Sequence, residues 1–66
     1  MKAYTVQYRL DFEPEVKSFS FLAKNKKDAL EKAQFEIIPN VEKDAFVIEA
    51  WVYSVTYQNG NQKIFK

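Results

Sequence analysis

The chain has 66 residues, of which 47% are apolar and 17% aromatic, as is typical of one folded domain with a packed core. It contains no cysteine and no histidine, which excludes disulfides, zinc–thiolate sites and the commonest general base. The net charge of +1 argues against a strongly basic polyanion binder. We therefore expect a single domain, residues 1–66, with no cofactor and no metal.

The chain also lacks the signals of a membrane or exported protein. No apolar run approaches the roughly 20 residues that a membrane-spanning helix needs. Residues 1–6 alternate as a strand does and do not resemble a signal peptide. We expect a cytoplasmic protein without a membrane partner.

Two alternating segments open the chain and predict a β-hairpin. Apolar and polar residues alternate over residues 3–10 and again over residues 17–23. Pro14 and the charges around it favour a loop over residues 12–15. With this loop, both apolar rows lie on one face of the hairpin. The predicted register places Tyr8 opposite Phe19, Val6 opposite Phe21 and Tyr4 opposite Ala23.

The next segment predicts a helix over residues 26–38. Asn25 suits the N-cap position, where its side chain can accept a hydrogen bond from a free backbone N–H. Leu30, Ala33 and Ile37 follow at helical spacing. Pro39 ends the pattern, because proline lacks the N–H that the helix needs.

A long strand and a short return strand complete the chain. Residues 45–57 are rich in β-branched and aromatic residues, and Asn59-Gly60 predicts a two-residue type I′ turn back into residues 63–65. Strict alternation gives the long strand two apolar faces. One face carries Phe46, Ile48, Ala50, Val52 and Phe65, and the other carries Val47, Trp51, Tyr53, Val55, Tyr57 and Ile64.

Together these elements predict an α+β fold. Its order is ββαββ, with a four-stranded antiparallel sheet in strand order 2-1-3-4 and one helix packed on one face. One short helix covers only one face, so the other face of the third strand needs a cover or becomes a binding surface. The residues expected on that surface are Val47, Trp51, Tyr53, Val55 and Tyr57.

We therefore expect a non-enzymatic interaction module that forms a homodimer or binds a protein partner through this aromatic face. The alternatives are that sheet twist and loops bury part of the face, or that its rings stack on bases. Ser18 and Ser20 have no histidine to activate them, and we interpret them as protection of an edge strand. Asp11, Glu13 and Glu15 are interpreted as a charged hairpin tip.

A second hypothesis concerns the lysines that begin the predicted helix. Lys24, Lys26 and Lys27 stand where the helix dipole disfavours positive charge. An electrostatically unfavourable placement of this kind sometimes marks a functional site. Lysines beside free backbone N–H groups can bind a phosphate. The alternative function is therefore weak binding to a nucleic-acid backbone, against an ordinary solvated lysine-rich surface.

Two family resemblances follow from these residues. Residues 1–6, a second strand and the segment 23–33 resemble the N-terminal half of HicB-type antitoxins, which run strand, strand and an A-x-[ST]-x-E-E-A-L-x-x-A helix. Residues 25–29 are similar to the lysine-rich start of the last helix in double-stranded-RNA-binding domains, which implies phosphate contacts for Lys26 and Lys27. The composition resembles small phage or mobile-element proteins of low-GC bacteria.

Overall fold

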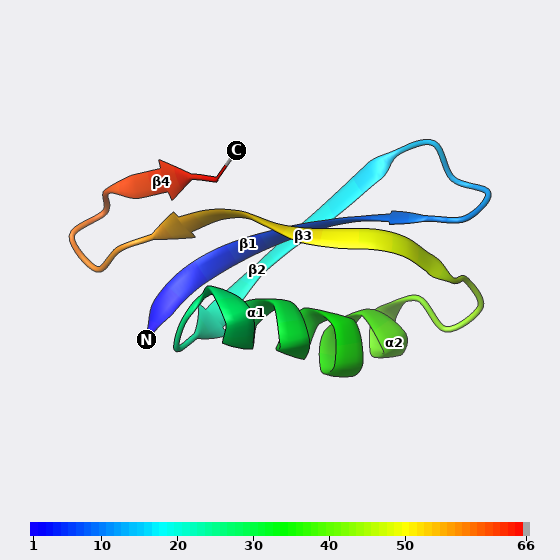
Figure 1. Cartoon of the computed structure of the whole chain (residues 1–66), viewed down its shortest axis with the longest axis horizontal. Coiled ribbons are helices and arrows are strands. Elements are labelled where there is room, and N and C mark those ends of the chain that lie inside the picture. Colours follow the sequence, from blue (N-terminus) through cyan, green and yellow to red (C-terminus); the bar gives the residue numbers. More distant parts are fainter. Residues whose placement is uncertain (66) are drawn as a thin grey trace.

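The structure is a computed structural model that describes residues 1–65. It is a small α+β domain in which one long helical segment lies against an antiparallel sheet (Figure 1). The elements in chain order are β1 (Lys2–Leu10), β2 (Val16–Ala23), α1 (Lys26–Lys32), the π-helical turn η1 (Ala33–Ile37), α2 (Ile38–Val41), β3 (Val47–Thr56) and β4 (Gln62–Ile64).

The sheet has the predicted topology. Its four strands lie in the order β2-β1-β3-β4, and each neighbouring pair is antiparallel. β1 is central, and its alternate residues Tyr4, Val6, Tyr8 and Leu10 are all buried. These side chains form the core together with the small helix residues Ala29 and Ala33. The alternation of residues 3–10 therefore predicted the core strand correctly.

The register of the first hairpin differs from the prediction by two residues. Tyr4 pairs with Phe21, Val6 with Phe19 and Tyr8 with Lys17, so all three predicted pairs are wrong. The chain turns earlier than expected, at Phe12, whose φ of 68° is in the left-handed region. Because side chains alternate with a period of two, a shift of two residues keeps every apolar side chain on its predicted face.

The helix begins as predicted but does not end at Pro39. The side chain of Asn25 accepts a hydrogen bond of 2.8 Å from the backbone N–H of Asp28, which confirms the N-cap. The π turn η1 then inserts one extra residue, and the N–H of Ile38 bonds to the carbonyl of Ala33. Pro39 occupies the first turn of α2, where its missing N–H is tolerated. The helical segment therefore continues to Val41.

The π turn also changes which isoleucine enters the core. A regular helix would bury Ala29, Ala33 and Ile37, the face that the sequence predicts. With one extra residue in the turn, Ile38 is buried and only 1% exposed, whereas Ile37 is half-buried. The prediction of Ile37 as the core residue is therefore wrong by one position.

A register shift in β3 breaks the predicted alternation of its faces. Val52 pairs with Val6 and Val55 pairs with Tyr4, and all four residues are in the buried core. Val52 and Val55 are three residues apart, so regular alternation would place them on opposite faces. They share a face because the register shift between Thr5 and Val6 inserts one extra residue into β3. Val55 is 3% exposed and is therefore a core residue, not part of the predicted open face.

The second hairpin has a different turn from the one predicted. Ser54 pairs with Ile64 and Val55 with Lys63, so the predicted pairs Val55–Ile64 and Ser54–Phe65 are wrong by one residue. A type I′ turn needs a positive φ at Asn59 and at Gly60, and among residues 1–65 only Phe12 and Gly60 (φ 90°) have one. The turn closes with hydrogen bonds between Tyr57 and both Gly60 and Asn61, which leaves a longer loop.

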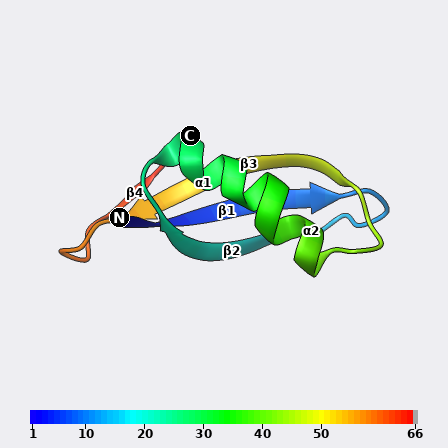
Figure 2. The ribbon, with the colours of Figure 1, turned by 90° about the horizontal axis from the view of Figure 1, so that it is seen from below.

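The helical segment crosses the sheet diagonally (Figure 2). Its start lies beside β3 and β4, where Lys26 and Leu30 line a hollow with Phe65. Its end lies over β1 and β2, where Glu42 bonds to Tyr8 and Lys17. This diagonal path leaves the first residues of β3 without a helix above them.

Candidate functional site

The predicted aromatic face is mainly a polar surface. Trp51 is half-buried, and its indole Nε1 donates a hydrogen bond of 3.0 Å to Oε1 of Gln7 on β1. The hydroxyls of Thr5 and Ser20 share a hydrogen bond of 2.7 Å on the neighbouring strands. Arg9 and Glu49 form a salt bridge of 2.7 Å. The second face of β3 is therefore not apolar, in contrast to the prediction.

The five residues predicted for that face do not form one patch. Val55 is in the core, and Val47 lies at the opposite end of β3 from Tyr57. Tyr53 is half-buried, and its carbonyl accepts the N–H of Phe65. Tyr57 lies just beyond the end of β3, where Lys2 approaches its ring to 5.7 Å. The structure thus separates residues that strict alternation grouped together.

The structure shows a different unpartnered feature, the outer edge of β3. β4 pairs with β3 over Ser54–Thr56, and Phe65 adds one hydrogen bond to Tyr53. Within residues 1–65, no strand pairs with the outer side of β3 from Val47 to Trp51. Figure 1 shows β4 alongside only one end of the much longer β3. We call Val47–Trp51 the open edge.

Large apolar side chains accompany the open edge. Phe46 is 79% exposed and Ile48 is 58% exposed, although the sequence predicted both on the helix-facing side. A second register shift, between Arg9 and Leu10, contributes to this difference: it pairs Val47 with the buried Leu10, so Val47 and not Ile48 lies on the helix-facing side of β3. The signal available from sequence was the apolar run Phe46-Val47-Ile48, which exceeds what one short helix can cover.

A groove runs between the start of α1 and the open edge. Its volume is about 390 Å³. It is lined mainly by apolar side chains, with one lysine at its rim. The lining residues are Lys26, Leu30, Ala50, Trp51, Val52 and Phe65. The groove places an apolar surface directly beside unpaired backbone groups.

The two outer edges of the sheet differ in how they are protected. Natural edge strands are usually guarded by lysine, proline or bulges, since unpaired backbone groups attract other strands. β2 is an edge strand, as predicted, and it carries Lys17, Ser18 and Ser20. The open edge contains neither lysine nor proline, and its one charge, on Glu49, is paired with Arg9. Its one protective device is the register shift opposite Arg9 and Leu10, which makes Ile48 an extra residue in β3.

A polar cluster ties the end of the helical segment to the first hairpin. The buried Tyr8 donates a hydrogen bond of 2.9 Å to Oε2 of Glu42, and Lys17 donates one of 3.1 Å to the same oxygen. Glu13 also approaches Lys17, at 3.3 Å. Hydrogen bonds from Lys17 and Tyr8 hold the pKa of Glu42 below its usual value, while burial raises the pKa of Tyr8. The bond to Glu42 raises the pKa of Lys17. We interpret the cluster as a structural clamp.

The clamp predicts how stability depends on pH. Because the pKa of Glu42 is lower in the folded state, its contribution is complete above the ordinary glutamate pKa of about 4.3 and is lost as the pH falls below it. The raised pKa of Tyr8 has the opposite sign, so its contribution is lost above about pH 10.

At pH values below about 4, we expect the urea concentration at the unfolding midpoint to decrease as the pH is lowered. This decrease should be less steep in Glu42→Gln than in the wild type. Glu13→Gln is the matched control, because Glu13 contacts Lys17 but not Tyr8. Equal slopes for Glu42→Gln and the wild type would contradict the role of Glu42.

The lysines of the alternative hypothesis are exposed around the start of α1. Lys26 lies over the ring of Phe65, with Nζ 4.4 Å from the centroid. The backbone N–H of Lys24 bonds to Oδ2 of Asp28, and this bond lowers the pKa of that carboxyl. Lys27 is exposed beside them. The negative charge of Asp28 therefore partly offsets the unfavourable interaction between these lysines and the helix dipole.

Within residues 1–65, no group of three or more side chains is arranged to hold a metal ion. In the same range, no helix is long and apolar enough to cross a membrane. Comparison of the chain with protein-family models, curated proteins and solved structures gives no match.

Proposed function

We propose that the protein is a non-enzymatic interaction module that binds an extended segment of a partner protein along the open edge of β3. The unpaired outer side of Val47–Trp51 carries this proposal. A strand added there would continue the sheet, and its backbone would bond to the free N–H and C=O groups of β3. Backbone pairing supplies affinity, and side-chain pockets beside the edge supply specificity.

The groove beside the edge defines the chemistry of the partner segment. Alternate side chains of an added strand point to the helix side, where Leu30, Val52 and Phe65 present apolar surface. The ammonium of Lys26 lies at the rim and suits a carboxylate. The partner segment therefore alternates apolar and polar residues and carries an acidic residue near one end.

Exposed apolar side chains support the same surface. The exposed side chains of Phe46 and Ile48 would be covered by the partner, which removes apolar surface from water. The proposal keeps the predicted class of function, a protein-binding module, but moves the surface. The predicted centre at Trp51, Tyr53 and Tyr57 is replaced by the edge that begins beside Phe46.

A short synthetic peptide tests the proposal. The probe is an acetylated peptide of about eight residues that alternates valine and threonine and ends in aspartate. We expect it to shift the amide NMR signals of Val47–Trp51 and to slow their hydrogen exchange. Ile48→Lys should remove this binding, because lysine guards an edge strand, whereas Ser20→Lys on the β2 edge should leave it unchanged.

A peptide that binds at β2, or that binds Ile48→Lys as well as the wild type, would contradict the proposal. So would a peptide that leaves the spectrum unchanged at millimolar concentration. Sedimentation of the free protein distinguishes one further outcome. A mass that doubles with concentration in the wild type but not in Ile48→Lys would identify a second copy of the chain as the occupant of the edge.

A further inference from the structure

A second surface lies at the end of the molecule where β1 begins and β3 turns into β4. Lysines from three separate segments gather there. The pairing of Lys2 with Ala23 brings the start of β1 beside Lys24. Nζ of Lys26 and of Lys63 lie 4.4 and 5.8 Å from the centroid of the same ring, that of Phe65. We call this group the basic end, and its lysines are Lys2, Lys24, Lys26, Lys27 and Lys63.

Acidic groups are scarce at the basic end. The three segments that form it are residues 1–2, 24–28 and 57–65, and they contain a single carboxylate, that of Asp28. This carboxylate is already engaged by the N–H of Lys24 at 3.0 Å and by Nζ of Lys32 at 3.6 Å. The lysines therefore present their charge to solvent with little neutralisation.

The acidic residues are concentrated at the opposite end of the molecule. A hollow there is lined by the β1–β2 loop and by the connector between α2 and β3. Its carboxylates are those of Asp11, Glu13, Glu42 and Asp44. The molecule is 38 Å long, whereas charge is screened over about 8 Å at physiological ionic strength. A partner at the basic end therefore encounters the lysines and not the net charge of +1.

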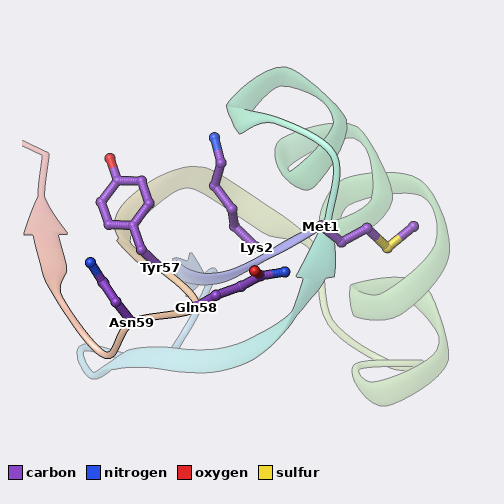
Figure 3. A pocket seen from close by; sticks show the side chains of 5 residues that line it. All are labelled: Met1, Lys2, Tyr57, Gln58 and Asn59. Atoms are coloured by element: carbon purple, nitrogen blue, oxygen red, sulfur yellow. The ribbon is translucent and has the colours of Figure 1, made fainter.

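The basic end also offers an aromatic ring and side-chain amides. Tyr57 is 38% exposed and lines an open hollow of about 400 Å³ with Met1, Lys2, Gln58 and Asn59. Figure 3 shows the side chains of Lys2 and Tyr57 projecting in the same direction. Lysine suits a phosphate, an exposed ring suits stacking on a base, and an amide can bond to base edges.

We propose that the basic end binds single-stranded nucleic acid. Its lysines contact the phosphates, and the ring of Tyr57 stacks on a base. The site differs from the predicted lysine cluster because it adds Lys2, Lys63 and the second hairpin. It contains no residue of the open edge Val47–Trp51, but it shares Lys26 and Phe65 with the groove beside that edge. A single strand fits better than a duplex because its bases are free to stack.

Fluorescence anisotropy with a labelled oligothymidylate of about 12 nucleotides tests this proposal. Five phosphate contacts predict a slope of about −3.5 in a plot of log affinity against log salt. The double variant Lys26→Gln, Lys63→Gln should reduce the slope by about 1.4. Lys43→Gln, which removes a lysine from the acidic end, is the matched control and should leave the slope unchanged.

Tyr57→Leu separates nucleic acid from other polyanions. It should weaken binding of the oligothymidylate about fivefold or more, since one stacked base is lost. Binding of heparin, which has no bases, should not change. Far-UV circular dichroism confirms that each variant is folded.

An affinity that does not depend on salt would overturn the proposal, as would an equal effect of Lys43→Gln and the double variant. If Tyr57→Leu weakens neither ligand, the basic end binds polyanions through charge alone, and the assignment to single-stranded nucleic acid is wrong. Tighter binding of a duplex than of the single strand would also overturn it.

Discussion

Replacing Ile38 with alanine is expected to lower the free energy of unfolding by about 2 to 5 kcal/mol. Ile38 is one of the largest fully buried side chains, and alanine would leave a cavity between the helix and β1. A domain of this size has a total stability of roughly 3 to 10 kcal/mol, so this variant should be partly or largely unfolded at 25 °C. Urea denaturation followed by tryptophan fluorescence measures the change.

Ile37→Ala is the matched control for this prediction. Ile37 precedes Ile38 and is half-buried, so its replacement should cost clearly less. The contrast depends on the π turn at Ala33–Ile37, because a regular helix would bury Ile37 in place of Ile38. A larger loss for Ile37→Ala than for Ile38→Ala would show that the helix continues without the extra residue.

Replacing Val55 with lysine is expected to prevent folding. Val55 is 3% exposed and packs beside Tyr4 in a core cluster that, among residues 1–65, contains no carboxylate to pair with a lysine. A buried charge without a partner costs about 4 kcal/mol or more, a large part of the stability of a small domain. Loss of dispersion in the NMR spectrum, or loss of a cooperative urea transition, would report the effect.

Ile64→Lys is the control, because Ile64 is on the paired strand β4 but is 48% exposed. It should change the free energy of unfolding by no more than about 0.5 kcal/mol. The comparison tests the register shift in β3, since strict alternation would place Val55 on the open face. A folded and stable Val55→Lys protein would contradict the shift.

The sequence predicted those features that depend on period and on local chemistry. The alternation of residues 3–10 identified the core strand, Asn25 identified the start of the helix, and Gly60 identified the last turn. The strand order followed from these elements. Each of these signals is contained in a few neighbouring residues, so it can be recognised from the sequence alone.

Three of the differences arise from a single residue inserted into a regular element. The π turn moves Ile38 into the core, the register shift in β3 moves Val55 there, and the longer loop before Asn61 changes the pairing of β4. Each insertion depends on packing between segments that are distant in the sequence. It therefore cannot be predicted from a short sequence pattern.

The open edge was not predicted because it depends on lengths and directions in space. β4 pairs with only the last residues of β3, and the helical segment runs diagonally across one face from β3 toward β2. Both facts leave the start of β3 uncovered. The predicted Trp51 face assumed perfect alternation, and the pairing of Trp51 with Gln7 instead makes that face polar.

The availability of the open edge is tested most directly by amide hydrogen exchange in the isolated protein at low concentration. We expect the amides of Val47–Trp51 that point away from β1 to exchange rapidly, whereas the amides within the β3–β4 ladder at Ser54–Thr56 are protected. Equal protection along the whole of β3 would contradict the account, because the edge would then be covered in the free protein.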